Sequence, residues 1–272
     1  MPMNYRHAYH AGNFADVAKH LAIVVILLRL RVKETPFVVV DSHAGRGLYN
    51  LDGEEARRTG EAETGIGRLR GLSNGPAALS TYLDLVRGTG PGLYPGSPLF
   101  AAKLLRPQDR LVAIEKHPED AAALAAALGP FRNARSEIGD GYARLPALLP
   151  PPERRGFVLI DPPYETESEF EDAARAFASA YHRFATGTYA IWFPVKSSAE
   201  ADSLCGEVLA AGVRRAIRLD VALKAPQEDR LASAGLLIVN PPYRFEEDFR
   251  AAFAPASALS GTDARLERLM GD

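Results

Sequence analysis

Short apolar runs, separated by longer segments of mixed polarity, dominate the pattern of this 272-residue chain. Runs of four to eight apolar residues rich in valine and isoleucine indicate buried strands, whereas the segments between them have helical periodicity or alanine content. The pattern predicts seven strands, at 37–40, 110–115, 135–139, 157–160, 188–195, 213–223 and 235–240. It predicts helices at 15–32, 98–105, 118–128, 141–149, 167–184 and 199–211, with Ser97 as an N-cap.

The alternation of strands and helices predicts an α/β protein with a mostly parallel sheet. Only a polar loop separates the last two strands, so we expect them to pair antiparallel. Seven strands with the last one reversed are the pattern of the Rossmann-like class I methyltransferase fold. We place this domain at residues 1–53 and 94–245, a small helical insertion at 54–93, and a C-terminal tail at 246–272. From residue 254 on, this tail is expected to be loose, with one possible short helix.

Composition narrows the class of protein without naming a function. The chain is 47% hydrophobic and 24% charged, with a net charge of −2, as in ordinary globular proteins. A single cysteine, Cys205, excludes an internal disulfide and argues against a structural zinc site. The apolar run Leu21–Leu28 is far shorter than the roughly 20 residues that span a membrane. We therefore expect a cytoplasmic monomer without a membrane partner.

The first 33 residues differ in charge from the rest of the chain. They hold five lysines and arginines and one acid, a net charge of +4, which leaves −6 for the remainder. This N-terminal helix, nearly encircled by apolar positions, is expected to be buried, with Asn13 or Asp16 as its cap. The basic segment is compatible with phosphate contacts, but on charge alone a solvated helix face is the favoured interpretation.

The tetrapeptide Asp161-Pro162-Pro163-Tyr164 follows the apolar run at 157–160. Prolines cannot extend a sheet ladder, so the strand ends there and Asp161 lies at its carboxyl end, where open α/β sheets bind ligands. A carboxylate, a carbonyl and an aromatic ring then share one stiff corner. This combination suits binding of a planar amino group by hydrogen bonds while the ring stacks on its plane.

Three further acids lie at or beside strand ends. Asp41 precedes the turn Gly45-Arg46-Gly47, Glu115 ends the second strand, and Asp140-Gly141 follows the third. Any one of these acids could simply cap a helix or face solvent. Together with Asp161 they would line one crevice, with Glu115 placed for ribose hydroxyls and Asp140-Gly141 for an adenine.

A second copy of the motif, Asn240-Pro241-Pro242-Tyr243, follows the predicted seventh strand. Because that strand is antiparallel, its carboxyl end should lie at the opposite edge of the sheet. We interpret this copy as a structural turn.

An adenine amino group fits the Asp161 corner. Its nitrogen is a poor nucleophile because the lone pair is delocalised into the ring. Hydrogen bonds to the Asp161 carboxylate and the Pro162 carbonyl would favour a more reactive nitrogen. Tyr164 would stack on the base, a contact worth roughly 1–3 kcal/mol, once the base had left its own stack.

Several segments form a pattern that extends over about residues 4–243: Tyr5-Arg6-His7-Ala8-Tyr9-His10-Ala11-Gly12-Asn13, Ala15-Asp16-Val17, Lys19-His20, Asp41-x-His43-Ala44-Gly45-x-Gly47, Tyr94-Pro95-Gly96-Ser97-Pro98, Asp140-Gly141 and Asp161-Pro162-Pro163-Tyr164-Glu165. With these segments the chain resembles the bacterial ribosomal RNA large subunit methyltransferase J family. The N-terminal segment and the Asp-x-His-Ala-Gly turn are its most specific parts.

The resemblance implies methylation of the N6 of adenine 2030 in 23S ribosomal RNA, with S-adenosylmethionine as cofactor, S-adenosylhomocysteine as product and no metal. It implies that Asp161, with Pro162 and Tyr164, is catalytic, and that Tyr5, His7 and Lys19 organise the RNA. The residues implied for cofactor contact are Lys19, His20, His43, Gly45, Ser97, Glu115, Asp140, Gly141 and Asp161. Without the resemblance, Tyr5 and His7 read as a packed arm, and His20 and His43 as buried, hydrogen-bonded histidines.

Other functions stay open on the sequence alone. A DNA adenine-N6 methyltransferase uses the same tetrapeptide, and a non-catalytic RNA-binding factor could hold the cofactor without chemistry. An NAD-dependent oxidoreductase is least favoured because the full Gly-x-Gly-x-x-G is missing after the first strand. A metal site built from His7, His10 and His20 lacks supporting thiols or closely spaced carboxylates.

Overall fold

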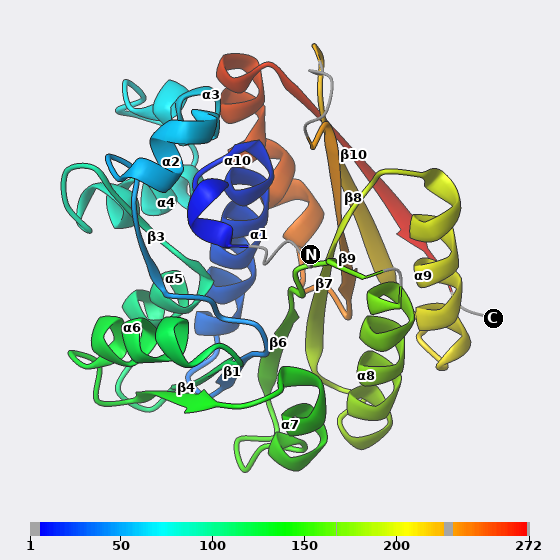
Figure 1. Ribbon diagram of the computed structural model, residues 1–272. Helices are drawn as coiled ribbons and strands as arrows, with labels where there is room; N and C mark the ends of the chain where they lie inside the picture. Colours follow the sequence, from blue (N-terminus) through cyan, green and yellow to red (C-terminus); the bar gives the residue numbers. More distant parts are fainter. Residues whose placement is uncertain (1–5, 167, 226–230, 271–272) are drawn as a thin grey trace.

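The computed structural model describes residues 6–270 except 167 and 226–230, and a mixed eight-stranded sheet forms its centre (Figure 1). The strands of this sheet are β1 Val38–Asp41, β4 Arg110–Glu115, β5 Ala134–Ile138, β6 Gly156–Ile160, β7 Thr188–Pro194, β8 Ala216–Leu223, β9 Ser233–Val239 and β10 Thr262–Leu269. Two short strands, β2 (Leu48–Asn50) and β3 (Leu93–Pro95), pair separately and antiparallel.

The strand order is β10-β8-β9-β7-β6-β1-β4-β5. Strands β5, β4, β1, β6 and β7 are parallel, and β9 lies antiparallel between β7 and β8. The predicted α/β sheet with a reversed seventh strand is therefore confirmed. Val40 of β1 lies level with Val112 of β4 and Val158 of β6, so the carboxyl ends of these central strands meet at one edge.

Helices cover both faces of the sheet, as a parallel core requires. One face carries α7, α8 and α9, and the other carries α1, α5, α6 and α10 (Figure 1). The helix bounds are α1 Phe14–Arg31, α2 Glu54–Thr59, α3 Glu61–Thr64, α4 Ala77–Arg87, α5 Ser97–Leu104, α6 Pro118–Leu128, α7 Gly141–Leu148, α8 Glu169–Arg183, α9 Ser198–Ala210 and α10 Phe245–Ser260, with 3-10 turns η1 His7–Tyr9 and η2 Ile66–Leu69.

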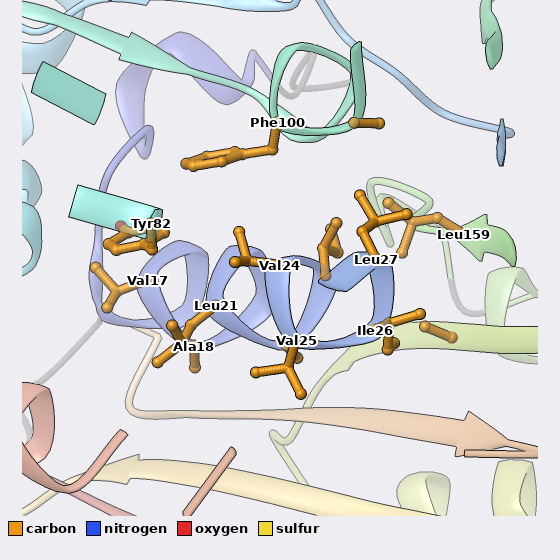
Figure 2. Close-up of a cluster of buried hydrophobic side chains, with 14 of the residues drawn as sticks. Val17, Ala18, Leu21, Val24, Val25, Ile26, Leu27, Tyr82, Phe100 and Leu159 are labelled. Carbon is orange, nitrogen blue, oxygen red and sulfur yellow. The ribbon is translucent and has the colours of Figure 1, made fainter. Parts of the chain in front are cut away.

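Helix α1 is enclosed by the rest of the fold over most of its length. All its residues are buried except Leu28, Arg29 and Arg31, which confirms the predicted buried helix. Figure 2 shows Tyr82 and Phe100 on one side of its apolar side chains. Asn13 caps the helix by accepting a hydrogen bond from the Asp16 amide at 2.9 Å. Of the two predicted caps, Asn13 and Asp16, Asn13 is therefore the N-cap. This burial fixes in place every polar group that α1 carries.

The prediction of a loose tail was wrong. Residues 245–260 form α10, which packs on α1 and α4, and residues 262–269 form β10, which pairs antiparallel with β8 over its full length. Phe245, Phe249 and Phe253, spaced four residues apart, are buried on one face of α10. Strand β10 alternates between more and less buried positions, as expected for the edge of a sheet.

The segment 54–93 is largely helical, with α2, α3, η2 and α4. Helix α4 packs on α1, and α2 packs on η1 at the N-terminus. Within the described part of the chain, no helix combines the length and the apolar character needed to cross a bilayer.

Candidate active site

The Asp161-Pro162-Pro163-Tyr164 corner leaves the sheet directly after β6. Tyr164 turns the backbone with a left-handed φ of 53° and is only 9% exposed. Its hydroxyl donates a hydrogen bond to the carbonyl of Trp192 at 2.7 Å, and its ring contacts Phe170 and Trp192. The corner is thus held by packing as well as by its two prolines.

A buried lysine joins α1 to this corner. Lys19 Nζ lies 2.7 Å from Asp161 Oδ2 and 3.0 Å from Asp16 Oδ1, and it lies 5.6 Å from the centroid of the Trp192 ring. Lys19 and Asp16 are nearly inaccessible, and the Asp161 side chain is 11% exposed. An ammonium group between two carboxylates offsets the cost of burying all three charges.

Asp16 also connects this ion cluster to the N-terminal motif. Its Oδ2 accepts hydrogen bonds from His7 Nε2 and from the Gly12 amide, both at 2.9 Å. Burial opposes ionisation of Asp16, but the neighbouring charges of His7 and Lys19 hold its pKa well below the usual value. His7 and Lys19, both implied to organise RNA, therefore share one carboxylate; Tyr5 lies outside the described residues.

The glycine turn after β1 lies beside the Asp161 corner at the same edge of the sheet. The Ser42 amide donates to the carbonyl of Leu159 in β6 at 3.0 Å. Gly45 and Gly47 have φ values of 60° and 74°, which disfavour other residues, and a Cβ on Gly45 would lie 2.3 Å from the Tyr49 hydroxyl. The turn therefore exposes backbone next to the catalytic candidate.

Asp41 ends β1 beneath this turn and is 1% exposed. Its Oδ2 accepts a hydrogen bond from Ser97 Oγ at 2.6 Å, whereas Oδ1 is buried and has no hydrogen-bond partner in the part of the chain that the structure describes. Burial, with some repulsion from Asp161, raises the Asp41 pKa to about 7. The prediction that Ser97 is the N-cap of α5 was wrong: Gly96 is the N-cap, and Ser97 is the first helical residue. The Ser97 hydroxyl bonds to Asp41 instead of capping the helix.

Two other predicted acids have partners within the chain. Glu115 accepts hydrogen bonds from the amides of Gly45 at 2.9 Å and His117 at 2.8 Å. Asp140 caps α7 through the Ala143 amide and pairs with Lys116 at 3.0 Å. A Cβ on Gly141 would lie 1.9 Å from the Ser42 carbonyl, so the glycine lets α7 begin against the β1 turn.

His20, which is buried, and His43, which is half-buried, are neutral groups at ordinary pH. His20 Nδ1 lies 2.7 Å from the Tyr94 hydroxyl, and burial lowers its pKa to about 3. His43 Nδ1 lies 2.7 Å from Ser42 Oγ, its ring meets Tyr142 edge-on, and burial lowers its pKa to about 4. His7, His10 and His20 each contact a different residue, and no group of metal-ligating side chains occurs among the described residues.

Comparison with known proteins decides the family. Residues 34–256 match the family described as "Ribosomal RNA large subunit methyltransferase D, RlmJ". The chain is 40% identical to ribosomal RNA large subunit methyltransferase J of Escherichia coli, over 90% of this chain and 89% of that protein. It is 37% identical to the protein of the same name from Haemophilus influenzae, over 91% and 90%.

The chain belongs to the ribosomal RNA large subunit methyltransferase J family. A crystal structure of protein LPL1258 from Legionella pneumophila has the same fold, with a TM-score of 0.87 and 31% identity over 97% of this chain and 99% of that one. The family expected from the motifs is confirmed, and with it the class of enzyme, an S-adenosylmethionine-dependent ribosomal RNA methyltransferase.

In this methyltransferase the second tetrapeptide lies at the other edge of the sheet, as predicted. The Asn240 carbonyl accepts a hydrogen bond from the side chain of Thr188, the first residue of β7. Asn240 Nδ2 donates to the carbonyls of Ala185 at 2.9 Å and Gly187 at 2.8 Å, and Tyr243 is 85% exposed. These hydrogen bonds tie Asn240 to the segment before β7.

Sequence reasoning did not assign Asp16, Trp192 or Tyr142 to the site. Asp16 could have been found, because it precedes Lys19 by three residues and so shares its helix face. Trp192 is the single tryptophan of the chain, but only the sheet order places it beside Asp161. Tyr142 contacts His43, and its hydroxyl is buried without a hydrogen-bond partner among the described residues.

Proposed function

We propose that this chain methylates the exocyclic N6 of one adenine, adenine 2030, in 23S ribosomal RNA, with the base flipped into the Asp161 corner. The observation that supports this proposal most is the placement of the Asp161 carboxylate. It lies at the carboxyl end of β6, 2.7 Å from Lys19 Nζ and beside the glycine turn after β1. The names of the relatives from Escherichia coli and Haemophilus influenzae point to the same class of RNA.

Asp161 and Pro162 perform the substrate chemistry in this proposal. The Asp161 carboxylate and the Pro162 carbonyl accept hydrogen bonds from the two N6 hydrogens, which localises the nitrogen lone pair for attack. The Lys19 ammonium holds the Asp161 carboxylate in position through an ion pair at 2.7 Å. Asp161 is the group that accepts the proton released from N6.

Tyr164 supplies the stacking surface for the base. Its ring is held by Phe170 and Trp192, and its hydroxyl is bonded to the Trp192 carbonyl. A ring fixed in advance loses little freedom when a base stacks on it, so more of the stacking energy contributes to binding.

The residues around the glycine turn fit S-adenosylmethionine, whose sulfonium group supplies the methyl. Asp41 Oδ1, which has no hydrogen-bond partner among the described residues, can accept a hydrogen bond from the amino group of this cofactor. The residues that would hold the cofactor are Lys19, His20, His43, Gly45, Ser97, Glu115, Asp140, Gly141 and Asp161. His20 and His43 are uncharged there, so they add no positive charge beside a cationic cofactor.

A methylation assay on matched substrates tests the proposal. The purified chain, S-adenosylmethionine and an RNA hairpin that contains the adenine should yield N6-methyladenine, whereas a DNA hairpin of the same sequence should yield far less. Preference for DNA would replace the RNA assignment by a DNA adenine methyltransferase. Cofactor binding without methylation of either hairpin or of whole unmodified 23S ribosomal RNA would indicate a non-catalytic RNA-binding factor.

A further inference from the structure

The insertion 54–93 holds the N-terminal motif, defined here as residues 6–13, through one carboxylate. Glu61, the first residue of α3, lies with Oε1 3.0 Å from His10 Nδ1 and with Oε2 3.0 Å from Asn13 Nδ2. Its side chain is only 15% exposed. These two bonds cross 51 and 48 positions of the sequence, so they are tertiary contacts that no local pattern requires.

Two further hydrogen bonds from the insertion reach backbone carbonyls of the motif. The Ile66 amide donates to the Gly12 carbonyl at 2.9 Å, and Thr59 Oγ1 donates to the Tyr9 carbonyl at 2.5 Å. A Cβ on Gly65 would lie 2.1 Å from the Gly12 carbonyl oxygen. The contact is therefore close along the whole motif, and Glu61 provides its charged hydrogen bonds.

A continuous series of hydrogen bonds connects Glu61 to the reacting corner. Glu61 holds the Asn13 side-chain amide, and Asn13 Oδ1 accepts from the Asp16 amide at the start of α1. Asp16 pairs with Lys19, and Lys19 pairs with Asp161. Each step is 3.0 Å or shorter.

We propose that Glu61 is a positioning residue for methyl transfer, which fixes Asn13 and His10 so that Asp16 and Lys19 hold Asp161 in its reactive orientation. This inference rests on the proposed function, and it gives the insertion a role that the methyltransferase fold alone does not require. Glu61 touches neither cofactor nor base. Its effect is therefore mainly on turnover, because only Lys19 and Asp161 of the residues proposed to hold the cofactor lie on this series.

Three variants test this role. Glu61→Ala removes both hydrogen bonds, whereas Glu61→Gln retains an oxygen for Asn13 and an N–H group for His10 Nδ1. Glu63→Ala is the matched control, because Glu63 lies on the same helix, is exposed, and has no hydrogen bond or ion pair to the described part of the N-terminal motif. Rates are measured with S-adenosylmethionine and unmodified 23S ribosomal RNA from cells that lack this protein.

Glu61→Ala should lower kcat by roughly tenfold to a hundredfold, the range that a displacement of about 1 Å at a reacting group produces. Its calorimetric Kd for S-adenosylhomocysteine should change far less than kcat, because seven of the nine residues proposed to hold the cofactor lie outside this series. Amide hydrogen exchange in a peptide covering residues 6–16 should become faster. Glu61→Gln should recover most of the rate and most of the protection, and Glu63→Ala should match the unaltered chain in all three measurements.

Unchanged kcat in Glu61→Ala would overturn the inference, as would a weakened Kd together with faster exchange throughout the chain. If Glu61→Ala does not fold, Asn13→Ser replaces it, since serine retains the N-cap but cannot reach Glu61; unchanged kcat there also overturns the inference. An unaltered chain that methylates no ribosomal RNA refutes the proposed function instead. In that case faster exchange at residues 6–16 in Glu61→Ala would still support the structural link, and unchanged exchange would refute it.

Discussion

Two nearly identical tetrapeptides, Asp161-Pro162-Pro163-Tyr164 and Asn240-Pro241-Pro242-Tyr243, follow two strands of the same sheet and have different surroundings. In the first, the acid pairs with a buried lysine and the tyrosine is 9% exposed. In the second, the amide binds two backbone carbonyls and the tyrosine is 85% exposed. Strand direction causes the difference, because β6 is parallel to its neighbours and β9 is antiparallel to both of its own.

The comparison teaches that the surroundings of a short motif depend on the edge of the sheet at which it lies, and under the proposed function only the first tetrapeptide lies where the reacting groups gather. Lys19, Asp41 and the glycine turn all lie near the carboxyl ends of β1 and β6. At the opposite edge the same backbone shape serves to close a turn. Substitutions at corresponding positions of the two tetrapeptides therefore separate catalytic from structural effects.

The largest expected effect is that of Asp161→Ala. It should lower methyl transfer on the order of a thousandfold, because N6 loses its charged hydrogen-bond acceptor. The thermal midpoint should stay near that of the unaltered chain, since Lys19 retains Asp16 at 3.0 Å. Initial rates and melting curves measure the two effects, and retained turnover would count against Asp161 as the catalytic residue.

Asp41→Asn should have opposite effects on stability and on cofactor binding. The folded-state pKa of Asp41, about 7, lies above its ordinary value of 3.8. Between these values the folded chain holds a proton that the unfolded chain has lost, so the stability contribution falls as pH rises through this window. The full loss is a few kcal/mol, at about 1.4 kcal/mol for each pH unit.

Since asparagine does not ionise, cofactor-free Asp41→Asn should be more stable than the unaltered chain at pH 8, and the difference should shrink toward pH 4. Urea unfolding at both pH values measures this difference. Calorimetry should show weaker binding of S-adenosylhomocysteine, because the free Oδ1 is a poorer acceptor as an amide. Equal stability of the two proteins at pH 8 would argue against an Asp41 carboxyl group whose pKa is raised by burial.

Asn240→Ala should reduce stability while leaving turnover per folded molecule unchanged. The change leaves the carbonyls of Ala185 and Gly187 without their donor, and it places alanine at a φ of 50°, where asparagine is better tolerated. The expected loss in the free energy of unfolding is about 1–3 kcal/mol. A drop in kcat at a temperature where the variant is folded would assign a catalytic role to the second tetrapeptide.

The smallest expected effects on stability are those of Tyr164→Phe and Tyr243→Phe. Loss of the hydrogen bond from Tyr164 to the Trp192 carbonyl should cost about 1 kcal/mol of stability, whereas the exposed Tyr243 should tolerate the change. Guanidinium unfolding of both variants measures this. Equal effects would mean that the Tyr164 hydroxyl does not hold the corner.

The parallel core was predictable because its strands are continuous apolar runs, such as Phe157–Ile160, that are buried on both faces. The C-terminal strand β10 could not be predicted, because it is an edge strand whose polar residues outnumber its apolar ones. Helix α10 contains Pro255, which masks its helical pattern, although Phe245, Phe249 and Phe253 give the four-residue spacing of a buried face.

The candidate site also contains residues that could be placed from the sequence and contacts that could not. Asp161 and the glycine turn could be placed from the sequence because strand ends determine their position. The pairing of Lys19 with Asp161 joins residues 142 positions apart, and that of His10 with Glu61 joins residues 51 apart, so neither follows from local spacing. Such contacts depend on the packing of α1 and of the insertion.

Mass spectrometry of 23S ribosomal RNA, from cells that lack the native protein and express one variant, tests the central claim most directly. The account predicts N6-methylation of adenine 2030 with the unaltered chain and with Asn240→Ala, and none with Asp161→Ala. Methylation that persists with Asp161→Ala and disappears with folded Asn240→Ala would contradict it, because the chemistry would then belong to the other edge of the sheet.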